Sequence, residues 1–443
     1  MPSRAELERW DREHVWHPFC QMADYEPLII SRAHGCTLYD LDGRAYLDGV
    51  SSLWCNVHGH HHRRLDDAIR EQIGQVTHTT LLGASNPATI ELARRLVELS
   101  PDGLNHVFFA SDGSSAVEVA LKMAFQYWQQ RPDPRPRKTS YVALGDAYHG
   151  DTLGSVSVGG VARFHDLFEP LLFEVQRLPS PVGSLAEHVR QAETLLAAEH
   201  ERIAALLIEP LVQCAAGIIV HPPGYLQALR ELTRRYDVLL IADEVAVGFG
   251  RTGTMFACEQ EHVAPDFLCL GKGLTAGYLP MAATLATTEV WNAFLAPTAA
   301  GRQFFHGHTF SGNPLAAAVA LESLRIFDTE RVLDRVAHLS ELLAAHGQRL
   351  ANNPHIGAVR QRGLLMGLDL VKQRSPAEPY PSAELRGARV CRRARDFGVL
   401  LRPLGNVLVV MPPLAIKPTE LDQIIDAIER SIEIECRDNS ETP

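Results

Sequence analysis

The sequence predicts an α/β fold with a mostly parallel central sheet in a large domain and a smaller α+β domain built from both termini. Short apolar runs alternate with longer amphipathic stretches through the middle of the chain, which is typical of repeated strand–helix–strand units. The length of 443 residues points to more than one structural unit, because a single core rarely grows beyond roughly 250–300 residues. Both flanks lack the alternation and show hairpin and long-helix signals instead.

The apolar runs in the middle of the chain are predicted to be buried strands. Strands of a parallel sheet covered on both faces read as nearly continuous apolar runs. The runs lie at residues 106–110, 141–144, 203–209, 238–244, 266–271 and 281–287. Amphipathic stretches between them, including residues 114–129 and 223–236, predict helices on both faces of the sheet.

The flanks predict the smaller domain. Residues 36–48 read as a hairpin around Asp42-Gly43. After about residue 327 we expect a long helix, strands near 363–371 and 407–411, and helices near 383–397 and 418–434. Two proline-rich stretches, at 131–138 and 372–382, are predicted to be surface loops. The predicted division is residues 1–60 and 328–443 for the small domain and residues 61–327 for the large domain.

Composition and charge exclude several classes of partner. The chain is 46% hydrophobic with a net charge of −11, and it has no block of Lys and Arg suited to a phosphate backbone, so nucleic acid is not expected. It has no apolar run near the roughly 18 residues that span a bilayer and no signal-peptide pattern, so we expect a cytoplasmic protein without a membrane partner. The eight cysteines and the HGHHH stretch lack metal-ligand spacing, so no metal is expected.

Two consecutive strand ends carry the residues with the most chemical content. Residues 239–253 read LLIADEVAVGFGRTG and residues 266–274 read DFLCLGKGL. Each run ends in a polar residue at the carboxyl end of a predicted strand, the edge where α/β sheets bind ligands. Asp243 and Lys272 are 29 residues apart, which is enough for one crossover connection, so both are predicted at the same edge.

One cofactor accounts for this pair of residues. A Lys in apolar surroundings is an amine nucleophile that forms a Schiff base with a carbonyl group. A buried Asp needs a cationic or hydrogen-bonding partner. Pyridoxal 5′-phosphate (PLP) supplies an aldehyde for the amine and a ring nitrogen for the carboxylate. A surface ion pair would explain the two residues as well, so the other parts of a PLP site must also be present.

The other parts of such a site are found further upstream. A phosphate group binds backbone N–H groups at a helix N-terminus, and Gly113, Ser114 and Ser115 stand between a predicted strand and a long apolar helix. A simple N-cap would explain one Ser only. The pyridine ring needs a stacking surface, which Tyr148 and His149 provide just after the strand at 141–144.

Six ordered motifs resemble the class III (ω-type) aminotransferases of PLP fold type I. The motifs are SDGSSAVE, YHGDT, IEPLVQ, ADEVAVGFGRTG, GKGLTAGYLP and HGHTFSGNPLA, and the resemblance covers essentially the whole chain. It implies the PLP-dependent transferase fold type I, PLP as the cofactor, and transamination by a ping-pong cycle in which donor and acceptor use the same pocket in turn.

The resemblance also implies a role for individual residues. Lys272 corresponds to the Schiff-base lysine, Asp243 to the partner of the ring nitrogen and Tyr148 to the stacked aromatic residue, and these three are the implied catalytic residues. The other implied cofactor-binding residues are Gly113, Ser114, His149, Glu209, Val245, His308 and Thr309. In this family the residue at Thr309 reaches the phosphate of the neighbouring subunit's cofactor, which implies a homodimer with composite active sites.

Three further stretches resemble the members of the family that aminate 8-amino-7-oxononanoate (KAPA) to 7,8-diaminononanoate (DAPA) in biotin biosynthesis. They are WHPF at 16–19, GVSSLWCNVHGHHH at 49–62 and RPLGNVLVVMPPL at 402–414. The implied substrate-binding residues are Phe19, Leu53, Trp54, Tyr148, Arg251, Gly307 and Arg402. Arg402 would meet the KAPA carboxylate, for which the planar guanidinium fork is suited.

The amino donor and one alternative activity stay open at this point. Members that use S-adenosylmethionine usually have Tyr in place of Phe19 and a Trp pair in place of Leu53-Trp54, and the present pattern is closer to members that use lysine. An ω-aminotransferase acting on ornithine, 4-aminobutyrate or a β-amino acid would share every cofactor motif. The expected partners are therefore small-molecule substrates, KAPA and an amino donor, and a second copy of the chain.

Overall fold

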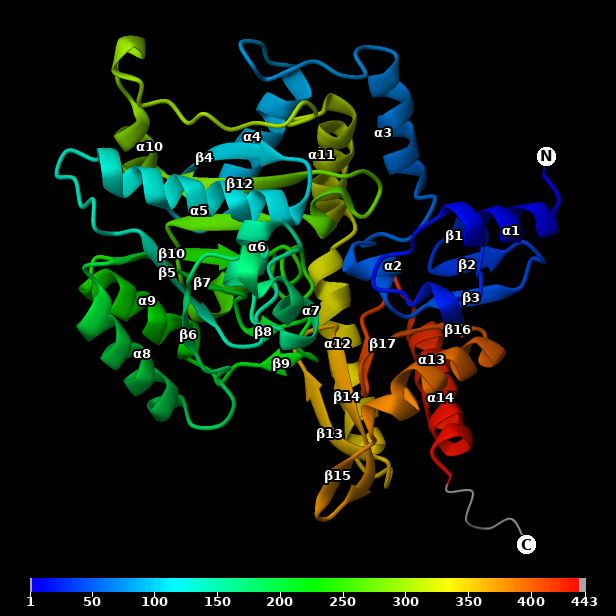
Figure 1. Ribbon diagram of the computed structural model, residues 1–443. Helices are drawn as coiled ribbons and strands as arrows, with labels where there is room; N and C mark the ends of the chain where they lie inside the picture. The colour runs from blue at the N-terminus through cyan, green and yellow to red at the C-terminus, as the bar shows by residue number, and fades with distance from the viewer. Residues whose placement is uncertain (1, 438–443) are drawn as a thin grey trace, which may run out of the picture.

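The computed structural model describes residues 2–437, and a seven-stranded sheet forms its largest layer (Figure 1). In spatial order the strands are β4 (Leu104–Ala110), β12 (Ala282–Thr287), β11 (Phe267–Leu270), β10 (Leu239–Asp243), β7 (Ile203–Ile208), β5 (Ser140–Leu144) and β6 (Gln176–Leu178). Only β12 runs antiparallel to its neighbours in this sheet. The prediction of a mostly parallel central sheet is confirmed, and all six predicted apolar runs are strands of it.

Successive residues of the central strands face opposite layers of helices. In β10, Leu240 and Ala242 belong to a core shared with α4, α8, α9 and α11, whereas Ile241 belongs to a core shared with α5 and α10. Side chains of a strand alternate between faces, so a strand buried on both faces must be apolar at every position. The helices of these layers are α4 (Pro87–Leu99), α5 (Gly113–Gln130), α8 (Leu185–Glu199), α9 (Tyr225–Arg235), α10 (Thr288–Phe294) and α11 (Pro314–Thr329). The predicted helices on both faces are present.

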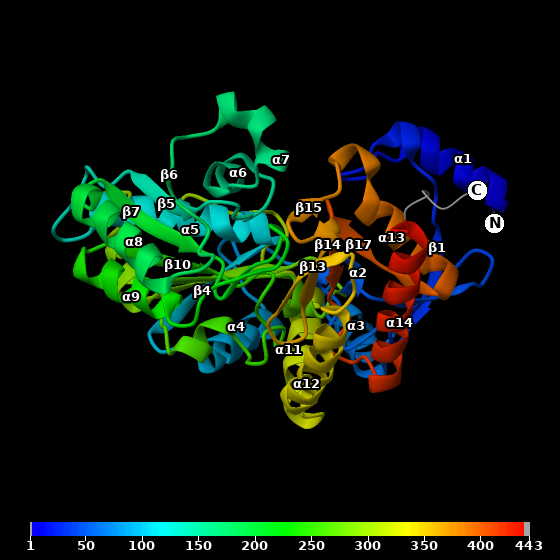
Figure 2. The same ribbon diagram turned by 90° about the horizontal axis from the view of Figure 1, so that it is seen from below.

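Two short helices and a small hairpin stand at the carboxyl edge of the sheet. They are α6 (Leu153–Val158), α7 (Ala162–His165), β8 (Val212–Gln213) and β9 (Ile219–Val220). Seen from below (Figure 2), α6 and α7 project from the layer that holds α5. They follow the YHGDT motif directly, so they border the edge where the predicted site lies.

The two flanks of the chain share a sheet. Strands β1 (Ile30–His34), β2 (Thr37–Asp40) and β3 (Ala45–Asp48) come from the N-terminal flank, and β16 (Val399–Leu400) from the C-terminal flank pairs in parallel with β3. The antiparallel pairing of β2 with β3 confirms the predicted hairpin around Asp42-Gly43. A second sheet consists of β13 (Ile356–Gln361), β14 (Met366–Arg374), β15 (Ala377–Pro379), β17 (Arg402–Leu404) and β18 (Val407–Val410).

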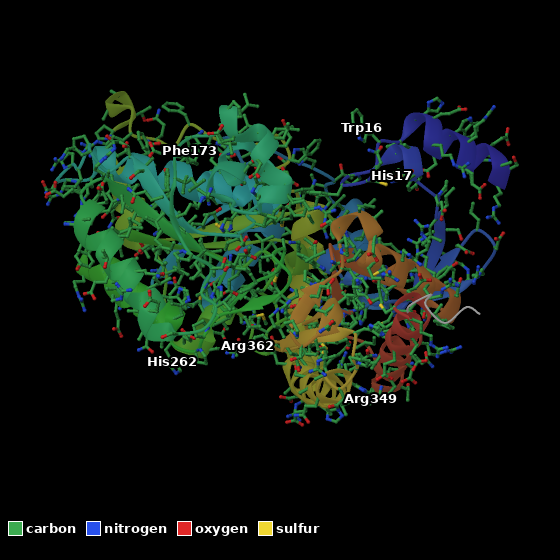
Figure 3. The ribbon with its side chains drawn as sticks, turned by 60° about the horizontal axis from the view of Figure 1, so that its bottom comes forward. Trp16, His17, Phe173, His262, Arg349 and Arg362 are labelled. Atoms are coloured by element: carbon green, nitrogen blue, oxygen red, sulfur yellow. The ribbon has the colours of Figure 1, made fainter. Side chains whose placement is uncertain are left out.

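Further helices complete the flanking region. They are α1 (Arg4–His14), α2 (Ser51–Trp54), α12 (Val332–Leu350), α13 (Arg386–Ala394) and α14 (Pro418–Glu435). Helix α3 (Arg63–Ile73) follows the N-terminal flank and packs against α11. In Figure 2, α13 and α14 lie opposite the large sheet, with α11 and α12 between them. Figure 3 shows Trp16 and His17 on the segment that follows α1, at the surface of the molecule. This segment leads to Phe19, so the N-terminus reaches the predicted substrate region.

Both proline-rich stretches differ in part from the predicted surface loops. Residues 372–382 contain the end of β14 and the strand β15, which pair as a hairpin. At the end of the other stretch, Lys138 is 3% exposed and its ammonium donates to the carbonyl oxygens of His200, Ile203 and Asp237. The prediction of surface loops was based on composition, which does not show that these residues bind the backbone of other segments.

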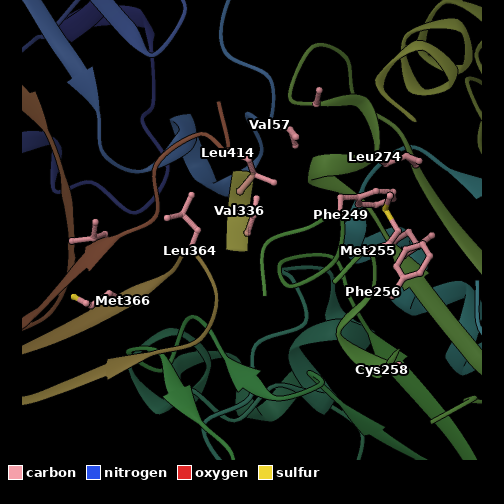
Figure 4. Close-up of a cluster of buried hydrophobic side chains, with 14 of the residues drawn as sticks. Val57, Phe249, Met255, Phe256, Cys258, Leu274, Val336, Leu364, Met366 and Leu414 are labelled. Atoms are coloured by element: carbon pink, nitrogen blue, oxygen red, sulfur yellow. The ribbon is translucent and has the colours of Figure 1, made fainter. Parts of the chain in front are cut away.

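One continuous core joins the central sheet to the C-terminal third. Figure 4 shows Phe249, Met255 and Phe256 lying together in this cluster, with Leu364 and Leu414 contributed by later segments. The rings of Phe249 and Phe256 are 5.6 Å apart at an edge-to-face angle. The loop after β10 is therefore fixed by packing against the C-terminal segments.

Between residues 2 and 437, no helix is both long and apolar enough to cross a bilayer. In the same part of the chain, no group of three or more His, Cys, Asp or Glu side chains is arranged to hold a metal ion.

Replacing the buried His221 with Phe is expected to protect the fold against acid. Burial lowers the pKa of His221 to about 3, and neither ring nitrogen has a hydrogen-bond partner among residues 2–437. Between its ordinary pKa and about pH 3 the unfolded chain binds a proton that the folded chain does not, so stability falls as the pH falls through this window. The free energy of unfolding is measured with urea at pH 7 and at pH 4.5. Between these two values the variant should lose about 2–3 kcal/mol less of this free energy than the natural chain.

The exposed His14 on α1 gives the matched control for this change. Between pH 7 and pH 4.5, His14→Phe should lose as much free energy of unfolding as the natural chain. An equal loss of stability in His221→Phe and the natural chain would contradict a buried neutral imidazole.

Candidate active site

The carboxyl ends of β10 and β11 bring Asp243 and Lys272 to one cavity. The two strands pair in parallel with Asp243 opposite Cys269, and Lys272 follows three residues later. Both residues line a cavity of about 430 Å³ at this edge of the sheet. The predicted neighbouring strands and the shared edge are therefore present. A larger cavity of about 770 Å³, between α5 and β5, contains none of the predicted site residues.

Asp243 is held in place by a buried imidazole. Its Oδ2 lies 2.7 Å from Nδ1 of His149, and its Oδ1 accepts the N–H of Val245 at 3.0 Å. Asp243 is 4% exposed and His149 3% exposed. A buried carboxylate needs such partners, because an unpaired charge in the interior is unfavourable. Nε2 of His149 has no partner within the described residues, so the pair keeps one free polar atom.

The N-terminus of α5 forms the opposite end of the cavity. Asp112 caps the helix by accepting the N–H of Ser115 at 2.8 Å, which leaves the N–H groups of Gly113 and Ser114 at the cavity wall. A Cβ atom on Gly113 would lie 2.6 Å from Cγ1 of Val245, so only glycine permits this approach. Exposed N–H groups at the start of an 18-residue helix are a binding site for an anion such as a phosphate.

Tyr148 and Glu209 form the wall beside Asp243. The Tyr148 N–H donates to Oε1 of Glu209 at 3.1 Å, and the Cys214 N–H donates to Oε2 at 3.0 Å. Burial raises the pKa of Glu209 to about 7, so its carboxyl group takes up a proton near neutral pH. The phenol of Tyr148 donates to Asp151 at 2.8 Å, and burial together with this carboxylate raises its pKa. The Tyr148 ring is therefore fixed at both its backbone and its hydroxyl end.

A second, smaller cavity of about 100 Å³ continues from the first on the side of the flanking sheets. The two cavities share Trp54, Tyr148, Ala215 and Lys272. Nζ of Lys272 lies 5.3 Å from the centre of the Trp54 ring. In the same cavity, the guanidinium of Arg402 lies 5.6 Å from the centre of the Phe19 ring. The second cavity is thus an apolar passage whose lining includes the Lys272 amine and the Arg402 guanidinium.

Four predicted residues are not brought to either cavity. Arg251 is buried, and its guanidinium donates to the carbonyl oxygens of Leu364 and Pro412 and to the hydroxyl of Ser51. These contacts leave it facing the protein interior, not the predicted substrate. Gly307 and Thr309 are exposed and His308 is half-buried, all in the loop before α11. Within one chain these three residues line neither cavity.

The structure adds residues to the site that the sequence did not single out. Those lining the cavities are Asp112, Gly150, Asp151, Thr152, Phe164, Ala215, Ala246, Leu404 and Val409. Asp151 and Thr152 stand in the YHGDT motif, so that motif contained a signal for them. Phe164 packs edge-to-face with Phe19 at 5.2 Å and comes from α7, for which the sequence carries no comparable signal.

Comparisons with known proteins define the class of this chain. Residues 20–432 match the family described as Aminotransferase class-III, and the chain belongs to that family. Class III aminotransferases depend on PLP, so the protein is a PLP-dependent aminotransferase of fold type I.

Particular relatives carry a more specific name. Proteins called adenosylmethionine-8-amino-7-oxononanoate aminotransferase from Aquifex aeolicus and Geobacter sulfurreducens are 48% and 47% identical to this chain, each aligned over 96% of it and 97% of the relative. The crystal structure of the protein of that name from Methanocaldococcus jannaschii superposes with a TM-score of 0.95 at 40% identity, covering 98% of this chain and 99% of that one. An ω-transaminase from Pseudomonas jessenii in complex with PMP gives a TM-score of 0.92 at 31% identity, covering 97% and 98%.

Proposed function

We propose that the protein transfers an amino group to KAPA and so forms DAPA, the reaction of biotin biosynthesis. The observation that carries this proposal is the apolar passage from Lys272 to the guanidinium of Arg402. An oxononanoate has an apolar chain that ends in a carboxylate, which matches an apolar wall with a cation at its far end. The relatives' shared name, at 40–49% identity over nearly the whole chain, supports the same acceptor.

The residues around the main cavity fit PLP. Lys272 offers a free amine, Asp243 a carboxylate for the ring nitrogen, Tyr148 an aromatic face, and Gly113 with Ser114 the N–H groups for the phosphate. Val245 would contact the ring, and His149 and Glu209 complete the wall of the cavity. When bound, PLP supplies an aldehyde and a ring that accepts electrons from the carbon losing its proton.

The side chains of the site would divide the chemistry among them. The Lys272 amine, once released from the cofactor, would take the proton from the carbon that loses it and deliver it to the carbon that gains it. Asp243, oriented by His149, would keep the ring nitrogen protonated. Arg402 would orient the acceptor through its carboxylate, and Phe19, Leu53 and Trp54 would exclude water from its chain.

A half-reaction without KAPA identifies the amino donor. The relatives' name supports S-adenosylmethionine, whereas Phe19 and Leu53 support lysine, because the first lacks a phenol hydroxyl and the second lacks an aromatic face for a sulfonium. We expect one donor alone to convert the visible absorption band of the bound cofactor to that of its amine form. Adding KAPA to the converted enzyme should then restore the original band and release DAPA, detected by mass spectrometry.

Ornithine, 4-aminobutyrate and β-alanine are the comparison substrates for this experiment. Faster conversion by one of these, together with no DAPA from KAPA, would contradict the proposal and favour another ω-aminotransferase activity.

We also propose a homodimer in which Gly307, His308 and Thr309 serve the partner's active site. Their absence from the lining of the chain's own two cavities supports this arrangement. Large apolar side chains near this loop are exposed in the single chain, with Leu82 90%, Phe305 75% and Phe310 62% exposed. Exposed apolar clusters of this kind are typical of protein interfaces. Small-molecule substrates and a second copy of the chain are then its partners.

Mixing two inactive variants, Lys272→Ala and Thr309→Glu, is expected to restore activity in heterodimers. One of the two composite sites would then carry neither change, while the other would carry both. With random assortment half of the dimers are mixed, so recovery should approach roughly a quarter of the natural activity. Native mass spectrometry must confirm the heterodimers, and their complete inactivity would contradict a role for Thr309 in the partner's site.

The remaining expectations belong to the same proposal. The division at residues 60/61 and 327/328 is supported by the pairing of β3 with β16, which joins the two flanks. A cytoplasmic location is supported by the eight cysteine thiols, all of which are unpaired, because unpaired thiols are typical of reducing compartments.

A further inference from the structure

Residues 50–54 include the short helix α2, but the backbone there is not regularly helical, because Ser52 and Leu53 have non-helical φ and ψ angles, and the segment is called the strained loop below. Ser51, Ser52 and Trp54 have φ angles of 51°, 61° and 64°, and none of them is glycine. The left-handed region is unfavourable for residues with a side chain, and such residues persist only where their surroundings fix them. Three such residues within four positions therefore require specific contacts, and these contacts point to what the loop does.

This strained loop carries two walls of the substrate passage. Leu53 is 43% exposed and lines the smaller cavity, and Trp54 is 9% exposed and lines both cavities. The Trp54 ring is the aromatic surface next to Nζ of Lys272, at 5.3 Å from its centre. A shift of the loop would therefore change the position of this ring relative to the Lys272 amine.

Two buried side chains, those of Asp48 and Ser51, fix the backbone of the loop by hydrogen bonds. The Asp48 carboxylate accepts the N–H of Val50 at 3.2 Å and that of Ser52 at 2.7 Å. The Ser51 hydroxyl donates to the carbonyl oxygen of Met411 at 2.6 Å and accepts from Nη2 of Arg251 at 3.2 Å. Ser51 is therefore the only residue of the loop, among those described, to which the Arg251 side chain donates.

Arg251 is a buried cation without a carboxylate partner among the described residues. Its Nη1 donates to the carbonyl oxygens of Leu364 at 3.2 Å and Pro412 at 2.7 Å. The segments of Leu364 and Leu414 converge on the core that holds the loop after β10 (Figure 4). Burial lowers the pKa of Arg251 to about 10. The Asp48 carboxylate, which accepts two N–H groups of the loop, partly offsets this shift, so the Arg251 charge is coupled to the loop through Asp48 as well.

We propose that Arg251 is a positioning residue, which acts through Ser51 to fix the strained loop and thereby the place of Trp54 beside Lys272. This assignment replaces the predicted contact of Arg251 with the substrate. It rests on the proposed role of Lys272 as the cofactor-binding lysine.

The resting holoenzyme, without substrates, gives the decisive readout. Arg251→Met and Ser51→Ala are both expected to change the visible circular dichroism of the bound cofactor, because the ring next to Lys272 moves. We expect kcat to fall by roughly tenfold to a hundredfold in Arg251→Met, as for a small misplacement of a reacting group. KM for KAPA should change by less than about twofold, since no substrate contact is removed.

A double-mutant cycle tests the route through Ser51. If Arg251 acts through that hydroxyl, the double variant should lose no more kcat than Arg251→Met alone. Losses that multiply would overturn the proposal, and so would an unchanged resting spectrum with a raised KM, which indicates direct substrate contact. If Arg251→Met does not fold, Arg251→Lys takes its place in the cycle and is scored in the same way, because a single ammonium cannot reach all three oxygens.

Arg230→Met is the matched control. Arg230 is also largely buried, but it pairs with Asp266 at the opposite edge of the sheet, at 2.6 Å. This variant should lower the melting temperature and leave the resting spectrum unchanged. Reduction of the natural holoenzyme with borohydride separates the two proposals. Failure to label Lys272 refutes the proposed function. If Lys272 is labelled but the Arg251 and Ser51 variants keep the resting spectrum of the natural chain, only this inference is refuted.

Discussion

Replacing Lys272 with Ala is expected to stop transamination and leave the fold intact. Lys272 is the only lysine among the residues that line the two cavities, so no other amine there can take over covalent attachment or proton transfer. Loss of a nucleophile that acts in every turnover lowers kcat by about 10⁴–10⁶. Steady-state assays with KAPA and each donor measure the loss, and circular dichroism in the far ultraviolet checks the fold.

The control for this variant is Lys372→Ala, which removes an exposed lysine on β14. It should retain natural activity. Turnover by Lys272→Ala within tenfold of the natural chain would show that another residue performs these steps.

Replacing Asp243 with Asn is expected to produce the second largest loss. The change keeps the volume of the side chain and removes the charge that we propose for the ring nitrogen. In the natural chain this carboxylate lies 2.7 Å from Nδ1 of His149. Loss of an electrostatic partner of a reacting centre lowers kcat by about 10²–10³ or more. Spectroscopic half-reactions should show slow proton transfer, and equilibrium dialysis should show weaker retention of PLP.

Asp266→Asn supplies the matched control for this substitution. Asp266 is another largely buried carboxylate, paired with Arg230 at the opposite edge of the same sheet. Its neutralisation should reduce stability and leave the half-reactions unchanged. Similar half-reaction rates in Asp243→Asn and the natural chain would exclude the assigned role of Asp243.

Much of the fold could be predicted because the central strands are buried on both faces. Every residue of β7 is buried, and such runs are apolar throughout and therefore visible in the sequence. Edge elements were harder to predict. Strand β6 has three residues of mixed polarity, and β15 lies in a stretch rich in proline. These strands depend on their neighbours for pairing, which local composition does not record.

The site was predictable where chemistry and strand position coincide. Asp243 and Lys272 each follow a buried strand, and the parallel pairing of β10 with β11 brings them together. Arg251 shows the limit of this reasoning, since its motif does not reveal that three oxygen atoms from distant segments surround it. The proposed role of Thr309 involves a second chain, and the position of Phe164 depends on the packing of α7, and neither leaves a local pattern.

The position of the cofactor on the chain tests the central claim most directly. The holoenzyme is reduced with borohydride, digested, and its peptides are mapped by mass spectrometry. We predict one pyridoxyl group per chain, on Lys272, in the peptide that contains the sequence LGKGL. Attachment to another lysine, or no attachment in an enzyme that still aminates KAPA, would contradict the assignment of the active site.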